Sequence, residues 1–173
     1  ITAWFNFDFV SGRPNPLDSW LGTTGSSAWD GGLFGLTQWT AILLAGSLAA
    51  DAVSGAAPGR SGGRLIASGA ALMLLAYALS CLSMPYDGQA PAEGKGDVAA
   101  SPVLPPFDRA EGRPIREFLA EPPFVQPPNT KQRPKNYGMM NKRIVTLPFV
   151  LVGIGFASLM YGAFVLLVDA KGL

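Results

Sequence analysis

The chain has 173 residues, of which 49% are hydrophobic and 14% charged, with a formal net charge of +1. Such a balance offers no basic stripe to neutralise a row of phosphates, which argues against a nucleic-acid partner. With no histidine and only one cysteine, the sequence lacks the commonest axial ligand of haem, the usual ligand of metals, and the pair of thiols that a disulfide or a Cys-x-x-Cys site requires. We therefore expect no cofactor and no metal site.

The first 33 residues predict an extramembrane arm rich in aromatic side chains. Phe5, Phe7 and Phe9 alternate with polar residues, a period of two that is typical of an extended strand with one buried face. The alternative is a position at the membrane–water boundary, which favours tryptophan, and the arm has three: Trp4, Trp20 and Trp29. Three carboxylates match no metal-binding loop and are expected to be solvated turn residues: Asp8, Asp18 and Asp30.

Residues 34–82 predict a transmembrane helical hairpin. Phe34–Val53 holds only Asp51 as a charge, and Leu65–Leu82 holds none. A helix rises about 1.5 Å per residue, so roughly 20 apolar residues cross a hydrocarbon core of about 30 Å. The eleven residues between the two runs, SGAAPGRSGGR, are rich in Gly and Ser and predict a short polar turn. Both runs are short enough that burial in a soluble bundle is the alternative.

Residues 83–143 predict a long irregular loop outside the membrane. The segment is dense in Pro, Gly and charge, so it cannot bury enough apolar area to form a core of its own. A short helix is expected from Pro114, because Ile115 and Phe118 then share one face. The rest is either a polyproline-like tether or a docking arm, whose anchors would be Phe107, Phe118 and Phe124.

The last apolar run is the clearest membrane span of the sequence. Leu147–Val168 contains no charge, and soluble helices seldom run this long without a charged residue on a solvent face. Thr146 is placed to cap the free backbone N–H groups, and Pro148 falls in the first turn, where a missing N–H costs nothing. Asp169 and Lys171 end the run in water.

Together these segments predict an all-α membrane protein with three transmembrane helices, a long irregular proline-rich extramembrane loop and an aromatic N-terminal arm. The expected divisions are an arm over 1–33, a hairpin over 34–82, a loop over 83–143, and a third helix with a short tail over 144–173. The first residue is not methionine and ITAWFNFDFVSG has no signal-peptide pattern. The chain is therefore either processed or part of a longer polypeptide, and we favour the second.

Small residues at a spacing of four let helix backbones approach closely. This spacing links Gly153 to Ala157 and Ser158 to Gly162 in the third run, and Ala41, Ala45 and Ala49 in the first. The expected helix-packing residues are Gly46, Gly153, Ala157, Ser158 and Gly162. They either pack the three helices on one another or contact another subunit, and the pattern favours neither.

No catalytic residue is expected in the chain. Without histidine, a general base or nucleophile would have to be a carboxylate with a pKa raised by burial, or a thiol beside a base. Asp51 and Asp169 fall at helix ends, where water or a basic residue is close, and neither has a partner in the sequence. Cys81 lies inside the second apolar run and is expected to be a small buried hydrophobe.

Two segments carry a resemblance to a known family: WDGGLFGLTQWTAILLAGSLAADAV, from Trp29 to Val53, and NKRIVTLPFVLVGIGFASLMYGAFVLLVDAKGL, from Asn141 to Leu173. The first resembles the "DPEG" membrane helix of the heparan-alpha-glucosaminide N-acetyltransferase family. The second resembles a later helix of that family, which has an NKxLW-type entry and a VDxKGL-type exit. The resemblance rests on Asp30, Gly32, Gly35, Gly46, Asn141, Lys142, Asp169, Lys171, Gly172 and Leu173.

The resemblance implies a multi-pass transmembrane acyltransferase, in which an acetyl group passes from cytosolic acetyl-CoA to a sugar amine. The histidine and the neighbouring polar residues of the family lie in earlier helices that this chain does not contain. The chain also has Gly31 and Gly32 where the family has a PEG-like step, and it inserts the proline-rich loop before Asn141.

Two functions from different classes follow. The first is a non-catalytic integral membrane subunit, in a respiratory or photosynthetic complex for example, whose partners are other membrane protein subunits and lipid. The second is the C-terminal part of a multi-pass acyltransferase that transfers acetyl from acetyl-CoA to an amino sugar, with its catalytic residues on a missing N-terminal portion. The chain as given is expected not to be an enzyme by itself.

The expected location is a bacterial inner membrane, and two arguments disagree on the orientation. Basic residues near the helix ends number five on the loop side and three opposite, which favours a cytoplasmic loop under the positive-inside rule. The resemblance implies the reverse, and a loop of about 60 residues is at the limit where the charge rule loses force. We therefore predict that the loop over 83–143 is non-cytoplasmic.

Overall fold

The computed structural model describes residues 16–22, 32–81, 101–104 and 134–172, with the single positions Tyr86, Ala99, Gly112 and Pro114. Several predictions from the sequence fall outside these residues: the strand over 5–9, the side chains of the three aspartates of the arm, the short helix after Pro114, and the phenylalanine anchors of the loop. Within the described residues the protein is helical and contains no strand.

The described chain consists of α-helices and one short π-helix: α2 (Pro16–Trp20), α3 (Gly32–Ser54), α4 (Pro58–Cys81), α5 (Leu147–Phe164) and the π-helix η4 (Val165–Ala170), which continues α5 without a break. Among the described residues, three stretches are long and apolar enough to cross a membrane: Gly35–Ser54, Pro58–Cys81 and Leu147–Ala170. The predicted fold class, an all-α protein with three membrane-spanning helices, is confirmed.

The connection between α3 and α4 is much shorter than the sequence predicts. α4 begins at Pro58, so only residues 55–57 separate the two helices, and the expected eleven-residue turn is wrong. Pro58 suits a first helical position, because the N–H that it lacks would have no partner there. The carbonyl of Ala57 accepts hydrogen bonds from the N–H groups of Arg60 at 2.9 Å and Ser61 at 3.0 Å. The Gly- and Ser-rich stretch after Pro58 is therefore the first two turns of a helix.

The start of α5 lies where the sequence predicts it, but its cap is built differently. Thr146 occupies the cap position with extended backbone and makes no side-chain hydrogen bond to the first turn, so the predicted side-chain cap is wrong. Its hydroxyl instead donates to the carbonyl of Met139 at 2.6 Å and accepts from the N–H of Asn141 at 3.1 Å. These two hydrogen bonds hold residues 139–141 against the start of α5.

Residues 134–146 form a compact segment before α5, which we name the entry segment. Its side chains at Asn136, Ile144, Val145 and Thr146 are fully buried. The Asn136 side chain donates to the carbonyl of Pro134 at 3.1 Å and accepts from the N–H of Gly138 at 3.0 Å, so its burial leaves no orphaned polar group. Val145 has a φ of 53°, which is rare for a β-branched residue and shows how tightly this turn is specified.

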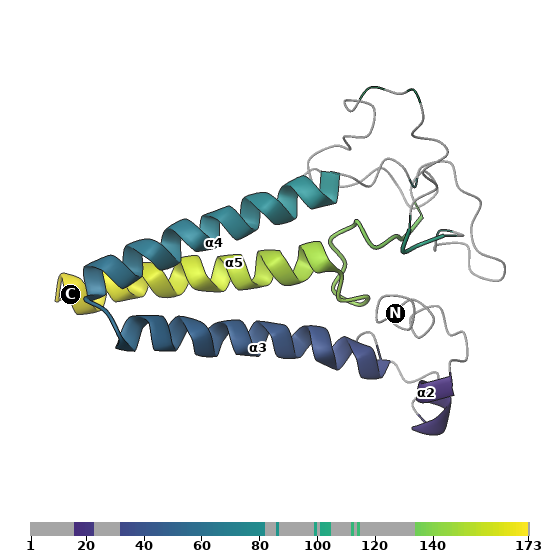
Figure 1. Ribbon diagram of the computed structural model, residues 1–173, viewed down its shortest axis with the longest axis horizontal. Helices are drawn as coiled ribbons and strands as arrows, with labels where there is room; N and C mark the ends of the chain where they lie inside the picture. Colours follow the sequence, from purple (N-terminus) through teal and green to yellow (C-terminus); the bar gives the residue numbers. More distant parts are fainter. Residues whose placement is uncertain are drawn as a thin grey trace.

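The three long helices lie alongside one another, with α5 between α3 and α4 (Figure 1). α4 runs antiparallel to α5, and α3 runs in the same direction as α5. The short connection before α4 and the end of η4 lie together at one end of the bundle, which we name the turn end, and the start of α5 lies at the other, which we name the loop end.

The helices differ in how much of their surface the protein covers. Of the most apolar window of each span, 28% is buried in α4 and 22% in α5 and η4, but only 6% in α3. α3 carries several large apolar side chains on its exposed surface: Leu36, Leu43, Leu44 and Leu48. α4 and α5 therefore pack closely on each other. Most of the surface of α3, in contrast, is not covered by the described part of this chain.

Candidate functional site

Two pairs of glycines form the contact between α4 and α5. A Cβ atom added at Gly69 would stand 2.5 Å from the carbonyl oxygen of Gly155, and one added at Gly162 would stand 2.7 Å from the carbonyl oxygen of Gly62. Real Cβ atoms essentially never approach another atom to less than 3.0 Å. Gly62 therefore faces Gly162, and Gly69 faces Gly155, with the two backbones in direct contact.

The glycines recur at an interval of seven residues on both helices, at Gly62 and Gly69 and at Gly155 and Gly162. The same interval continues to Ala76 on α4 and back to Pro148 on α5, and both of these residues are buried. We name this row of small residues the seam. A seven-residue repeat keeps one face of each helix turned towards its partner when the two coil gently around each other.

The π-helix η4 ends the seam at the turn end. A further step of seven from Gly162 would bring Asp169 to the next seam position. Instead each turn of a π-helix holds more residues than a turn of α-helix, which changes the direction of the side chains that follow. Leu166 packs against Gly62, with its Cγ 2.7 Å from the position that a Cβ would take, and Asp169 is exposed.

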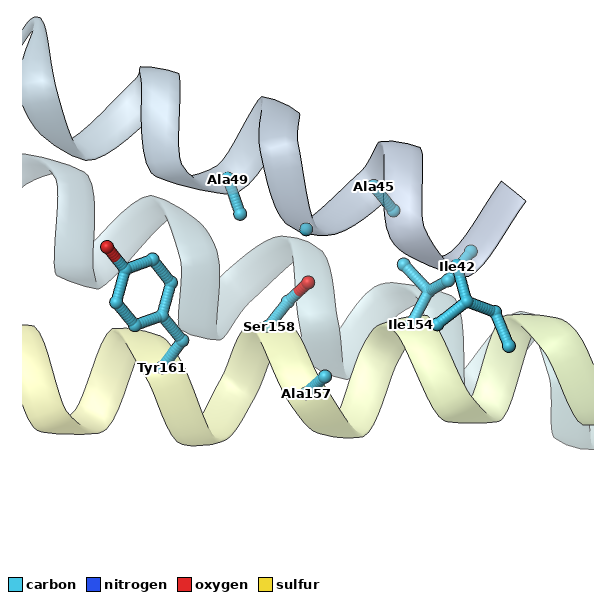
Figure 2. Close-up of a pocket in the computed structure, with 8 residues that line it drawn as sticks. Ile42, Ala45, Ala49, Ile154, Ala157, Ser158 and Tyr161 are labelled. Carbon is cyan, nitrogen blue, oxygen red and sulfur yellow. The ribbon is translucent and has the colours of Figure 1, made fainter. Parts of the chain in front are cut away.

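The contact between α3 and α5 has a different form. It contains an open cavity of about 190 Å³, lined by Ile42, Ala45, Gly46, Ala49, Ile154, Ala157, Ser158 and Tyr161 (Figure 2). We name this cavity the groove. On each helix the lining residues follow the spacing i, i+3, i+4 and i+7, which defines one face of an α-helix. In Figure 2 the side chains from α5, including the hydroxyls of Ser158 and Tyr161, point across the groove towards α3.

Larger side chains at the loop end hold α3 and α5 apart. The rings of Trp39 and Phe149 meet edge to face, with centroids 5.7 Å apart and planes at 76°. Next to them Ile42 reaches α5, where its Cδ1 atom lies 3.8 Å from the position that a Cβ on Gly153 would take. The alanines and glycine beyond them are too short to fill the remaining space, which is why the groove stays open.

A hydrogen bond ties α3 to the entry segment above the groove. The side-chain amide of Gln38 donates to the hydroxyl of Tyr137 at 3.1 Å, and the N–H of Tyr137 donates to the carbonyl of Pro102 at 2.8 Å. Burial raises the pKa of Tyr137, partly offset by the hydrogen bonds that its hydroxyl forms with Gln38 and the backbone of Leu147. This tyrosine links α3, the loop and the start of α5.

Tyr86 marks a second buried position of the loop. It is only 4% exposed, its hydroxyl donates to the carbonyl of Val103 at 3.0 Å, and burial raises its pKa to about 12. Such a group stays neutral at physiological pH and serves as a hydrogen-bond donor. The pKa values of Tyr86 and of the half-buried Tyr137 are both raised, which moves them further from neutral pH and from proton transfer there.

The five predicted packing residues divide between the two contacts. Gly162 lies in the seam against α4, whereas Ala157 and Ser158 line the groove together with Gly46 of α3. Gly153 faces Ile42 of α3 with room to spare. The structure therefore brings three of the five together, and the other two lie apart from them.

Sequence reasoning missed the other three seam glycines, Gly62, Gly69 and Gly155. Gly62 was assigned to a turn, and a search for a spacing of four does not find partners that are seven apart. The signal was present in the sequence, because the interval between Gly62 and Gly69 equals that between Gly155 and Gly162. A search for equal intervals on two neighbouring helices would have found it.

The carboxylates and the thiol that the sequence singled out do not gather into a site. Asp51 and Asp169 are exposed at the turn end, and Cys81 is buried as the last residue of α4, near the opposite end. In the described ranges, no three His, Cys, Asp or Glu side chains lie close enough to hold a metal ion. What the described side chains form is two helix contacts of different kinds.

Comparison with known proteins adds no relative. No protein-family model, no curated protein and no solved structure matches this chain. The geometry of the seam and the groove is therefore what bears on the function of this chain.

Proposed function

We propose that the chain is a non-catalytic integral membrane subunit, which packs against a larger membrane protein complex and helps to stabilise it. The observation that carries the proposal is the position of α3. It lies alongside α5 with only 6% of its apolar window buried, although α4 and α5 of the same chain are closely packed.

In a bilayer, apolar exposure alone does not drive helices together, because lipid tails are as apolar as leucine. Close packing between small residues does, and α3 presents such residues along the rim of the groove at Ala45, Gly46 and Ala49. A transmembrane helix of another subunit laid over this rim would gain the contacts that α5 does not supply. The groove face of α3 is therefore the proposed contact with the complex.

Two adjacent residues of α3 provide the test. Gly46 lines the groove, whereas Ser47 is turned about 100° further around the helix and does not line it. The Ser47 hydroxyl donates to the carbonyl of Leu43 in its own helix at 3.4 Å. Gly46→Leu is expected to lower co-purification of partner subunits at least about tenfold, which corresponds to a loss of about 1.4 kcal/mol. Ser47→Leu introduces the same leucine side chain outside the groove and should leave co-purification unchanged.

Equal co-purification of both variants at wild-type yield would contradict a contact at the groove. A loss that is equal in both would also contradict it, because bulk anywhere on α3 would then be enough. Each variant is first checked for membrane insertion and for wild-type helix content, so that a folding defect is not counted as a lost contact.

A second candidate is the C-terminal part of a multi-pass acyltransferase, which the resemblance of the two helices supports. One observation favours it: Asn141, one of the residues that carry the resemblance, organises the entry to α5. Its side-chain oxygen accepts hydrogen bonds from the N–H groups of Arg143 at 3.0 Å and Ile144 at 3.3 Å. Measuring the mass of the polypeptide in its native membrane separates the candidates. A mass near 18.1 kDa supports the subunit, and several further helices support the acyltransferase.

We also propose that the membrane is a bacterial inner membrane and that the loop over 83–143 is non-cytoplasmic. Protease added to sealed, right-side-out spheroplasts should then cut this loop. Cleavage seen only in inverted vesicles would contradict the proposed orientation and favour the count of basic residues.

A further inference from the structure

The early start of α4 changes the position of two arginines. As helical residues four apart, Arg60 and Arg64 project from the same side of α4, about one turn from each other. Gly62 lies midway between them and faces α5, and a step of two residues turns about 200° around a helix. Both arginines therefore point away from the seam, and both are exposed.

The depth of this pair in the membrane follows from the length of α4. Its 24 residues span about 36 Å, which exceeds a hydrocarbon core of about 30 Å. The apolar part begins at Leu65, so the extra length lies at the turn end and contains both arginines. Their guanidinium groups thus lie at the level of the lipid headgroups, while their methylene stems lie against the hydrocarbon boundary.

The surface around the arginines is free of obstruction. A Cβ atom added at Gly59 or Gly63 would meet nothing within 4 Å, so the backbone between the two guanidinium groups is open. Further into the bilayer the same exposed face continues with the short side chains of Ala67 and Ala71. This face of α4 is cationic at the turn end and apolar, with short side chains, further into the bilayer.

Charge favours an anion between the two arginines. Like charges four residues apart on a helix repel each other, and within residues 16–22, 32–81 and 134–172 neither guanidinium pairs with a carboxylate. The acidic groups at the same end, Asp51 and Asp169, lie on α3 and η4. Arginine binds phosphate with two parallel hydrogen bonds, so one phosphate can bridge both side chains.

We propose that Arg60, Gly63 and Arg64 form a binding site for the phosphate of an anionic phospholipid, with an acyl chain lying along Ala67 and Ala71. The site lies on the face of α4 opposite to α5 and outside the groove. It is therefore independent of the partner subunit proposed above, and either proposal can fail without the other.

The full chain, purified in detergent and offered equal amounts of phosphatidylglycerol and phosphatidylcholine with identical acyl chains, provides the test. Native mass spectrometry counts the lipids retained. The wild type should retain phosphatidylglycerol preferentially, and R60Q/R64Q should lower that preference by about 10- to 30-fold, given about 1 kcal/mol for each basic residue at a membrane surface. K171Q, which removes a basic charge at the same end but outside the site, should leave the preference unchanged.

Two further variants separate binding from folding. R60K/R64K keeps both charges and should retain part of the preference, because lysine cannot bind phosphate with a planar fork. Gly63→Leu keeps both arginines, fills open space and should lower the preference by obstructing the phosphate. The proposal is overturned if R60Q/R64Q and Gly63→Leu both retain the wild-type preference, or if K171Q loses as much as R60Q/R64Q.

Discussion

The central helix α5 uses small residues in its contacts with both α4 and α3, but only the contact with α4 is closely packed. Towards α4, Gly155 and Gly162 meet glycines of the partner helix, and the backbones touch. Towards α3, Ala157 and Ser158 meet Ala45 and other small residues, yet a cavity of about 190 Å³ remains. Small side chains therefore permit close approach without causing it. What decides the outcome is the side chains at the ends of the contact.

At the seam the equal intervals of seven bring each glycine opposite another, and larger side chains such as Leu166 and Met73 pack against the glycines. At the groove, Trp39 and Phe149 meet at one end and hold the helices apart. An apolar void gives up dispersion contacts on one side of each lining residue. The seam thus makes its packing contacts within the chain. The residues that line the groove would gain further contacts only from a molecule that fills it.

The largest expected effect comes from filling the seam, with two glycines of α5 as a matched pair. Gly162→Leu would place side-chain atoms against the carbonyl of Gly62, where even a Cβ stands at 2.7 Å. Overpacking against backbone that cannot yield should lower the free energy of unfolding in detergent by about 3 kcal/mol or more. Gly153→Leu meets only the flexible end of Ile42 at 3.8 Å and should cost less than about 1 kcal/mol.

Thermal or denaturant unfolding of the two variants in the same detergent provides the measurement. If Gly153→Leu is as destabilising as Gly162→Leu, the two contacts do not differ in the way described. The contrast between these two positions would then have to be abandoned.

Removing the aromatic contact at the loop end should loosen α3 alone. Trp39→Ala deletes the edge-to-face pair with Phe149 and is expected to lower the free energy of unfolding by about 1–2 kcal/mol. Hydrogen exchange should quicken in the amides of α3 and stay at wild-type rates in α4 and α5. Trp39→Phe keeps an aromatic edge and serves as the control. Faster exchange across all three helices would mean that α3 is not independent of the seam.

Alkaline pH should act on the loop end and spare the seam, which contains no titratable side chain. Burial raises the pKa of Tyr86 from 10.0 to about 12 in the folded protein. The neutral phenol is therefore favoured by folding, and its contribution is fully present below pH 10 and is lost as the pH rises towards 12. Tyr86→Phe should remove the share of this loss that Tyr86 causes and leave the share of Tyr137, whose pKa burial also raises. A tyrosine in the wild type that ionises late, followed by phenolate absorbance and absent from Tyr86→Phe, would confirm the assignment.

The smallest expected effect concerns the bond between α3 and the entry segment. Tyr137→Phe removes the acceptor of the Gln38 amide, a half-buried hydrogen bond of 3.1 Å. The expected loss is about 0.5–1.5 kcal/mol in the free energy of unfolding. Combining Gln38→Leu with Tyr137→Phe should cost less than the two single changes added together, because both remove the same interaction. Full additivity would show that the bond contributes nothing.

The sequence predicted the helices better than their contacts. Apolar runs of the length that a bilayer requires, with at most one charge each, identified all three spans, because burial in lipid demands apolar residues along most of the span. The start of α4 was missed, because Gly62 and Gly63 are unfavourable in an isolated helix and Arg60 and Arg64 are unfavourable in lipid. Gly62 is nevertheless helical because its lack of a side chain permits the close contact of the seam. Arg60 and Arg64 are compatible with a membrane helix at the level of the lipid headgroups.

The candidate contacts were only half predictable. A spacing of four selected Gly162, which lies in the seam, and Ala157 and Ser158, which line the groove, but it assigned no partner to any of them. Which helix each residue faces depends on the rotation of the helices about their axes. That rotation is set by bulky residues such as Trp39 and Phe149, whose pairing spans more than a hundred positions of the chain.

The central claim is that the groove face of α3 contacts another protein while the rest of α3 contacts lipid. Photoreactive amino acids placed singly at Gly46 and at Ser47, activated in native membranes, test it most directly, because the two positions are adjacent in sequence but only Gly46 lines the groove. A discrete protein adduct is expected from position 46 and mainly lipid adducts from position 47. Identical lipid adducts from both positions would contradict it.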